Sequence, residues 1–260
     1  MTDMLKVRRS RLYTLWFGWY SRRQFRRYFN SVRIVMQPGV RSMDNDTPVV
    51  FYCNHAYWWD GFWSQICTEV FFNQNLHIII GLKELQKHRF FTRIGAFSLD
   101  RSNARSAVKT LDYAADLLTT PSSRQNALWI FPQGLIEHVD KRPLFFFRGT
   151  EGIVNRVLRT TSRIYLVSVV SRIEYVEEQK PELFLSFQEP WLIDRDDLPE
   201  HKNITDSMQK TTEFHLDALK TKIIQRQLDD FEMLLKGTDS VNRKVDKFRC
   251  FFRQSKGHRK

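Results

Sequence analysis

The chain has 260 residues, a formal charge of +12 and 14% aromatic side chains. Its length and its 42% hydrophobic residues suffice for one good-sized core, and no apolar run reaches the roughly 18 residues that a membrane-spanning helix needs. The basic balance implies an anionic partner. The sequence contains no recognition helix, zinc finger or RNP pattern, which argues against a nucleic-acid-binding protein. The positive charge together with the aromatic content favours a lipid surface as the partner.

The three cysteines, Cys53, Cys67 and Cys250, fit no metal-binding template, and two of them lie in apolar runs. They predict buried or incidental thiols in a reducing compartment. The start of the chain leads directly into basic residues, which predicts no cleaved signal peptide.

Residues 8–33 mix arginines with aromatic side chains. A helix of this composition is too charged to span a bilayer but suits the headgroup plane, where each basic residue adds about 1 kcal/mol beside an anionic leaflet. The alternative is a helix packed on the domain with its arginines in solvent. We predict that residues 1–40 form a membrane-associating amphipathic helical segment. The residues predicted to contact the membrane are Trp16, Trp19, Arg22, Arg23 and Arg26.

The next segment carries a histidine and an aspartate between a strand and a helix. Residues 49–52 are β-branched or aromatic and predict a short buried strand, and the apolar run 61–72 predicts a helix. His55 and Asp60 lie between them, five positions apart. On a helix such positions are roughly 140° apart, and on a strand they face opposite sides. Only a turn brings the two side chains together.

A carboxylate beside an imidazole fixes its tautomer and leaves the other ring nitrogen free to take a proton. The pair therefore predicts a general base, His55, oriented by Asp60. A core histidine bonded to a carboxylate is the alternative. The same spacing recurs at His201 and Asp206, in a polar stretch with no strand before it, where it predicts only a solvated loop and helix start.

Residues 77–99 predict a strand at 77–81, a helix over 83–93 and a brief strand at 96–99. A helix capped by Ser102 follows and runs to about residue 118. Arg101 stands at the strand end beside this helix N-terminus, where a guanidinium is well placed to hold a phosphate. A surface pair between Asp100 and Arg101 is the alternative.

Residues 126–131 predict a further buried strand, followed by a turn at Pro132, Gln133 and Gly134. The turn either presents backbone N–H groups to a substrate or is a featureless strand-to-loop connection. A helix from residue 149 to about 160 and strands at 164–170 and 183–187 complete the segment.

Strands that alternate with helices predict an α/β domain with a central, mixed but mostly parallel sheet flanked by helices. We assign residues 41–200 to this core and residues 201–260 to C-terminal helices and a basic tail. A long helix over 204–236 would end at Gly237, and residues 244–260 are either a second membrane contact or a frayed end.

Four segments of the chain, in order, resemble the glycerolipid and lysophospholipid acyltransferases, the family that includes bacterial 1-acylglycerol-3-phosphate acyltransferase. Residues 54–60 (NHAYWWD) resemble the NHxxxxD block, residues 95–101 (GAFSLDR) the GxxFIDR block and residues 131–134 (FPQG) the FPEG block, and the strand at 164–171 stands where a fourth block is expected.

The resemblance implies that His55 deprotonates an acceptor hydroxyl while Asp60 orients it. The alkoxide then attacks the thioester of acyl-CoA or acyl-carrier protein directly, and the acceptor is a lysophospholipid or related lipid. It implies no metal and no cofactor, and a peripheral protein on the cytoplasmic face of a membrane. The implied substrate-binding residues are Asn54, Gly95, Arg101, Gln133 and Gly134.

The chain departs from the family pattern in the third and fourth blocks. Gln133 replaces a glutamate, Leu135 and Ile136 replace the usual threonine and arginine, and Ser168 stands near the place of a proline. These changes remove charged contacts to the acceptor. They leave open a glycolipid or another lipid alcohol as acceptor, or a non-catalytic membrane lipid binder that keeps the fold.

Overall fold

The computed structural model describes residues 4–196 and 203–238. The helices are α1 (Arg11–Tyr28), α2 (Pro38–Arg41), α3 (Asp60–Cys67), α4 (Leu82–Lys87), α5 (Ala104–Thr119), α6 (Gly149–Val157) and α7 (Ile204–Ile224), with short π or 3₁₀ segments at Thr68–Phe72, Arg89–Ile94 and Leu228–Asp230. The strands are β1 (Ser31–Met36), β2 (Val49–Cys53), β3 (Asn75–Gly81), β4 (Ala96–Leu99), β5 (Asn126–Ile130), β6 (Arg163–Glu174), β7 (Glu182–Phe187), β8 (Trp191–Asp194) and β9 (Glu232–Lys236).

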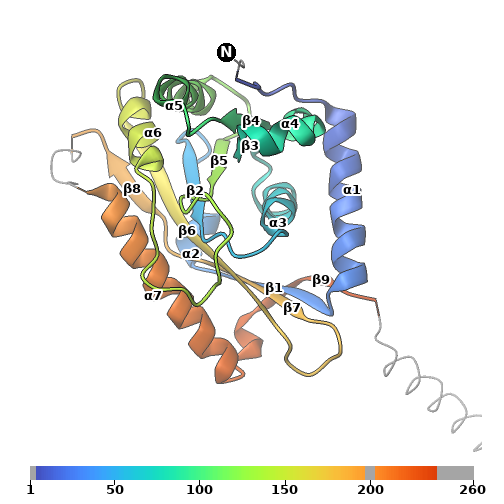
Figure 1. The fold of residues 1–260 in the computed structure, drawn as a ribbon. Coiled ribbons are helices and arrows are strands. Elements are labelled where there is room, and N and C mark those ends of the chain that lie inside the picture. Colours follow the sequence, from blue (N-terminus) through green and yellow to red (C-terminus); the bar gives the residue numbers. More distant parts are fainter. Residues whose placement is uncertain (1–3, 197–202, 239–260) are drawn as a thin grey trace, which may run out of the picture.

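The strands of the described chain form one mixed sheet in the order β4-β3-β5-β2-β6-β7-β1-β9, with β8 paired to β6 outside this path. Neighbours from β4 to β6 are parallel, whereas β7 and β8 run antiparallel to β6, and β9 runs antiparallel to β1. Helices α1, α3 and α4 cover one face and α5, α6 and α7 the other (Figure 1). The predicted α/β domain with a mostly parallel central sheet is confirmed.

Strand β2 shows that both faces of the central sheet are buried beneath helices. Its five residues, 49–53, are each at most 3% exposed. Val49, Phe51 and Cys53 pack into the cluster under α1 and α3, whereas Val50 and Tyr52 pack into the cluster under α5 to α7. Successive strand side chains point to opposite faces, so an unbroken apolar run is what a strand between two helical layers requires.

The C-terminal prediction of one long helix over 204–236 is wrong after residue 224. Helix α7 ends at Ile224, and residues 232–236 form strand β9, which pairs with β1. Strand β1 lies within residues 1–40, the segment predicted to be helical, so that prediction is wrong for residues 31–36. At Gly237 the chain passes so close to the backbone that an added Cβ would lie 1.8 Å from the Phe29 carbonyl oxygen. Long-range strand pairing, which local periodicity does not reveal, decides both elements.

The cap of α5 is Asn103, whose side chain accepts a hydrogen bond from Ser106 N, and not Ser102. Both residue types cap helices well, so the sequence alone did not separate them. The basic tail at residues 244–260 lies outside the described residues.

Candidate active site

The candidate site lies at one edge of the sheet. Strands β2, β4 and β5 belong to its parallel part and end at Cys53, Leu99 and Ile130. The carboxyl ends of parallel strands meet at one edge, which is where α/β sheets place their ligands. The segments that follow these ends carry His55, Arg101 and Gly134, as the sequence predicted.

His55 and Asp60 meet across the turn between β2 and α3. The distance from His55 Nδ1 to Asp60 Oδ2 is 2.9 Å. The Asp60 side chain is fully buried, whereas the His55 side chain is 24% exposed. An ionised carboxylate only accepts hydrogen bonds, so Nδ1 carries the proton and Nε2 is left as the basic nitrogen. Within the described chain no hydrogen bond to Nε2 is present.

Asp60 is held by four further hydrogen bonds. Its Oδ2 also accepts from the backbone N–H groups of Ala56 (3.1 Å) and Tyr57 (3.0 Å). Its Oδ1 accepts from Trp63 Nε1 (3.0 Å) and Ser171 Oγ (3.2 Å). Asp60 is also the first residue of helix α3, and the helix dipole favours a negative charge at this end. The acid is therefore fixed in position before any substrate arrives.

Trp63 and Ser171 were not identified from the sequence. Trp63 stands three positions after Asp60 on α3, a spacing that places both on one helix face, so a signal existed. Ser171 comes from β6, which pairs with β2, and no local pattern links it to Asp60.

The Asn54 side chain links the end of β2 to β6. It is 2% exposed, its Oδ1 accepts from Ser171 N (2.8 Å), and its Nδ2 donates to Ser171 O (3.2 Å). Both polar ends are thus bonded to β6, and we assign Asn54 to positioning and not to substrate contact.

Gly95 lies away from the site. It precedes β4, at the end of the parallel strands opposite to His55, with φ of 111°. A Cβ there would lie 2.2 Å from the Leu76 carbonyl oxygen. This close backbone approach accounts for the glycine without a ligand, so Gly95 is left out of the proposed site.

Arg101 and Gly134 are in direct contact. Gly134 has φ of 73°, and a Cβ on it would lie 1.8–2.1 Å from the Arg101 guanidinium. The guanidinium carbon also stands 4.6 Å from the centroid of the Phe147 ring. The Asp100 carboxylate accepts instead from Ser102 N and Oγ, so the alternative of an Asp100–Arg101 pair is wrong.

Arg101 has no carboxylate partner among the residues that the structure describes. Partial burial lowers the pKa of its guanidinium, which means that water solvates the charge incompletely. Arg101 is an exposed residue, and an unpaired guanidinium that contacts a glycine and an aromatic ring is suited to an anion such as a phosphate.

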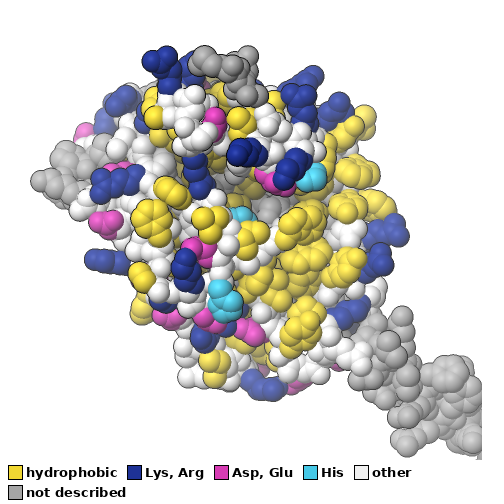
Figure 2. Space-filling view, viewed as in Figure 1, with side chains coloured by type: hydrophobic (Ala, Val, Ile, Leu, Met, Phe, Trp, Pro, Cys, Tyr) yellow, Lys and Arg dark blue, Asp and Glu magenta, His cyan; other side chains and the backbone are white. Residues whose placement is uncertain are grey.

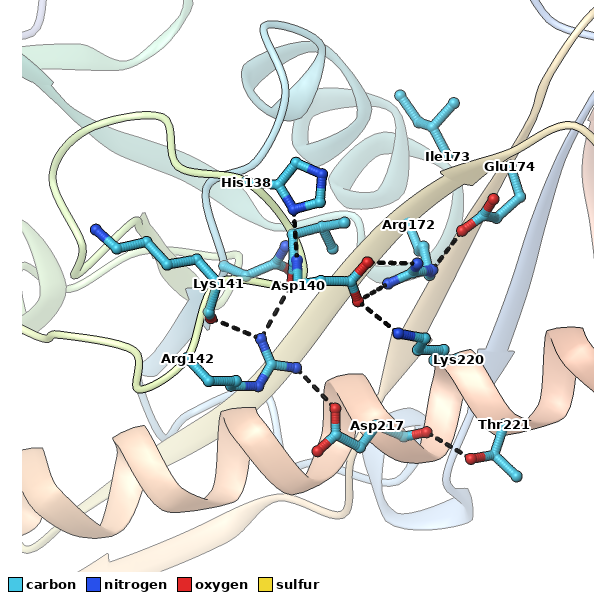
Figure 3. A network of polar contacts seen from close by, with 12 residues as sticks. His138, Asp140, Lys141, Arg142, Arg172, Ile173, Glu174, Asp217, Lys220 and Thr221 are labelled. Carbon is cyan, nitrogen blue, oxygen red and sulfur yellow. Dashed lines mark hydrogen bonds and ion pairs between the residues drawn. The ribbon is translucent and has the colours of Figure 1, made fainter.

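The loop from residue 131 to 148 carries Gln133 and Gly134. A network of ion pairs around Asp140 holds this loop against β6 and α7 (Figure 3). Asp140 accepts from Arg172 Nη1 (2.8 Å) and Nη2 (3.0 Å) on β6 and from Lys220 Nζ (3.0 Å) on α7. The Arg172 side chain is only 8% exposed. Arg142 adds a contact to Asp217 on α7 (2.8 Å).

We expect Asp140→Asn to lower the free energy of unfolding by about 2 kcal/mol, because it removes charged hydrogen bonds from a nearly buried arginine. Arg172 and Lys220 hold the pKa of Asp140 well below its ordinary value. This stabilisation is complete at neutral pH and is lost as the pH falls below the ordinary carboxyl range near about 4. Thermal melts at pH 7 and pH 3 should therefore show a smaller gap between wild type and variant at the lower pH.

The control for this prediction is Asp217→Asn, which removes an exposed pair with Arg142 and should change stability by about 0.5 kcal/mol or less. Equal effects of the two substitutions would contradict a special role for Asp140.

Helix α1 presents an apolar stripe to solvent. Leu12, Leu15, Trp16 and Trp19 are 49–78% exposed, and their spacing places them on one side of the helix. Figure 2 shows hydrophobic side chains gathered over the side where α1 and α3 lie. Of the predicted basic contacts, Arg23 and Arg26 are exposed, whereas Arg22 is partly buried and pairs with Glu69 at 2.9 Å.

None of the described helices has the length and hydropathy needed to cross a bilayer. Residues 4–196 and 203–238 also hold no group of three or more His, Cys, Asp or Glu side chains arranged to bind a metal ion.

Comparisons with known proteins give one family and one fold. The family model described as Acyltransferase matches residues 32–172, more than half of the chain. Among solved structures, the 1-acyl-sn-glycerophosphate (LPA) acyltransferase PlsC from Thermotoga maritima is similar, with a TM-score of 0.50 and 13% identity over 80% of this chain and 79% of that one. Identity this low shows a shared fold alone. No curated protein matches the chain.

Proposed function

Because the chain belongs to the acyltransferase family, we propose that it transfers a fatty acyl group from acyl-CoA or acyl-carrier protein to the hydroxyl of a lysophospholipid or related lipid. The predictions of this family and of an O-acyltransferase are confirmed. An acyl donor and a lipid acceptor follow from the family in general terms. Their identities and the roles of the residues are our proposal.

The observation that carries this proposal is the His55–Asp60 pair with its free Nε2. Nε2 takes the proton of the acceptor hydroxyl, and the oxygen attacks the thioester carbonyl. As the tetrahedral intermediate collapses, the carbon–sulfur bond breaks and the imidazolium returns the proton to the leaving thiolate. Asp60 stabilises the imidazolium between these steps. No covalent acyl-enzyme is required.

Arg101 supports an acceptor that carries an anionic head group. Its guanidinium is unpaired within the described chain and contacts Gly134, in the turn that follows β5. The neighbouring Leu135 and Ile136 are 54% and 51% exposed. One fixed cation beside apolar side chains suits a lipid with a single phosphate better than an acceptor with several charges.

The proposal is tested with a panel of acceptors and labelled acyl-CoA or acyl-carrier protein, with and without lipid vesicles. We expect labelled product with a lysophospholipid and release of one thiol for each ester formed. Transfer only to uncharged glycolipids would overturn the phosphate acceptor. Vesicle binding without thiol release for any acceptor would favour a non-catalytic lipid binder.

We further propose that the protein attaches peripherally to the cytoplasmic face of a membrane through α1. The exposed tryptophans suit the interface between headgroups and acyl chains, and Arg23 and Arg26 face solvent beside them. The buried cysteines Cys53 and Cys67 are free thiols, which agrees with a reducing compartment.

The double substitution Trp16→Ala and Trp19→Ala should weaken binding to vesicles containing anionic lipid by roughly tenfold, because about 1.4 kcal/mol of apolar burial is lost. Both rings are about half exposed, so folding should be unchanged. Sedimentation with vesicles measures the effect. Phe214→Ala, an exposed aromatic on α7 across the sheet, is the matched control, and an equal loss in the control would refute the assignment to α1.

A further inference from the structure

The backbone N–H and C=O groups of His55 both form hydrogen bonds with the loop that follows β5. His55 N donates to Gln133 Oε1 at 2.8 Å, and His55 O accepts from Glu137 N at 2.9 Å. Two residues of one loop thus hold both backbone polar groups of the proposed base, while Asp60 holds its ring.

Gln133 serves this purpose only in one orientation. A side-chain amide has an accepting oxygen on one side and a donating nitrogen on the other. Gln133 is 3% exposed, so water cannot readily satisfy a misplaced end. If the amide flipped, its NH₂ would face the His55 N–H, and two donors would oppose each other.

Glu137 selects the working orientation. Its Oε2 accepts from Gln133 Nε2 at 2.9 Å, and its Oε1 bonds to Lys141 Nζ. Hydrogen bonds from Lys141 and Gln133 hold the pKa of the Glu137 carboxyl below its ordinary value. The carboxylate therefore faces Gln133 as an acceptor and leaves the amide oxygen for His55.

We propose that Glu137 is a positioning residue: its carboxylate fixes the Gln133 amide, which holds the His55 main chain and with it the imidazole in line with Asp60. The inference rests on the proposed function for its effect on turnover. It names an acidic residue that the block pattern did not identify, four positions beyond the place where related chains carry their glutamate.

The test exchanges the two residue types. In Gln133→Glu, two carboxylates meet at hydrogen-bonding distance, which raises the pKa of one of them. At low pH the two carboxyl groups share a proton, so one donates a hydrogen bond to the other and His55 stays in position. As the pH rises, both are ionised and they repel each other. We expect kcat at pH 8 to fall about 100-fold, the cost of a displaced base, and to recover toward pH 5 relative to wild type. The double variant Gln133→Glu with Glu137→Gln restores one donor and one acceptor, and should regain most of the kcat at pH 8.

Glu137→Ala should lower kcat about tenfold with little change in KM, whereas Glu137→Gln, which keeps an acceptor oxygen, should lose about threefold or less. Rescue by the double variant supports the proposal. A double variant no better than Gln133→Glu, or a Glu137→Ala variant with the wild-type kcat, would overturn it.

A second readout does not depend on acyl transfer. The backbone amide and imidazole signals of His55 in NMR spectra of labelled protein should shift in Gln133→Glu with a pH dependence that wild type lacks, and should return in the double variant. If wild type shows these signals but transfers no acyl group to any acceptor, the proposed function fails and the positioning role stands. Unperturbed His55 signals in Gln133→Glu and in Glu137→Ala would remove the positioning role itself.

Discussion

His55→Ala should reduce acyl transfer by about 10² to 10⁴-fold, the usual contribution of a general base. Of the described side chains that bond to Asp60, only the imidazole is partly exposed, whereas Trp63 and Ser171 are buried. Removal of the imidazole leaves the bound substrates without a proton acceptor. The measurement is single-turnover transfer of labelled acyl groups, so that binding and chemistry are separated.

The variant should stay folded, because the His55 side chain is 24% exposed and its ring packs mainly on Phe131, with centroids 4.7 Å apart. The matched control is His88→Ala. His88 is the C-cap residue of α4, and its side chain is 51% exposed. Turnover of His55→Ala close to that of the His88 control would remove His55 from the mechanism.

Asp60→Asn should affect both activity and stability. The carboxylate oxygens face donors on both sides, namely His55 Nδ1 with two backbone N–H groups at Oδ2, and Trp63 Nε1 with Ser171 Oγ at Oδ1. An asparagine NH₂ must oppose one of these sets. Transfer should fall by about 10² or more because the imidazolium loses its anionic partner.

The same opposition of donors should lower the free energy of unfolding by about 1–3 kcal/mol, or roughly 3–10 °C in melting temperature for a chain of this size. Calorimetry measures the stability and the transfer assay the activity. Asp112→Asn, at an exposed position paired with Arg156, is the control. A variant as stable and as active as that control would show that Asp60 does not hold the base.

The sequence contained the local part of the site. The strand, the turn and the helix start around His55 and Asp60 lie within about a dozen residues, so spacing and strand–helix geometry were enough to predict that they meet. The general rule for strand ends in α/β sheets brought Arg101 and Gly134 to the same edge, and the structure places them in contact.

What could not be predicted depends on pairing between distant segments. Ser171 reaches Asp60 because β6 lies beside β2, and the last five residues of the predicted C-terminal helix, 232–236, form a strand because they pair with β1. Gly95 matched a sequence block, yet its conformation is required by the Leu76 carbonyl. Local patterns report neither which strand becomes a neighbour nor which backbone comes close.

The enclosure of Asp60 constrains the order of events in the proposed reaction. Both of its oxygens already accept hydrogen bonds and its side chain has no exposed surface, so no proton enters or leaves through the acid. The proton taken from the alcohol must depart from the same ring nitrogen that received it. In the proposed reaction, the acceptor oxygen and the departing sulfur therefore both come within hydrogen-bonding reach of Nε2, on one side of a single imidazole.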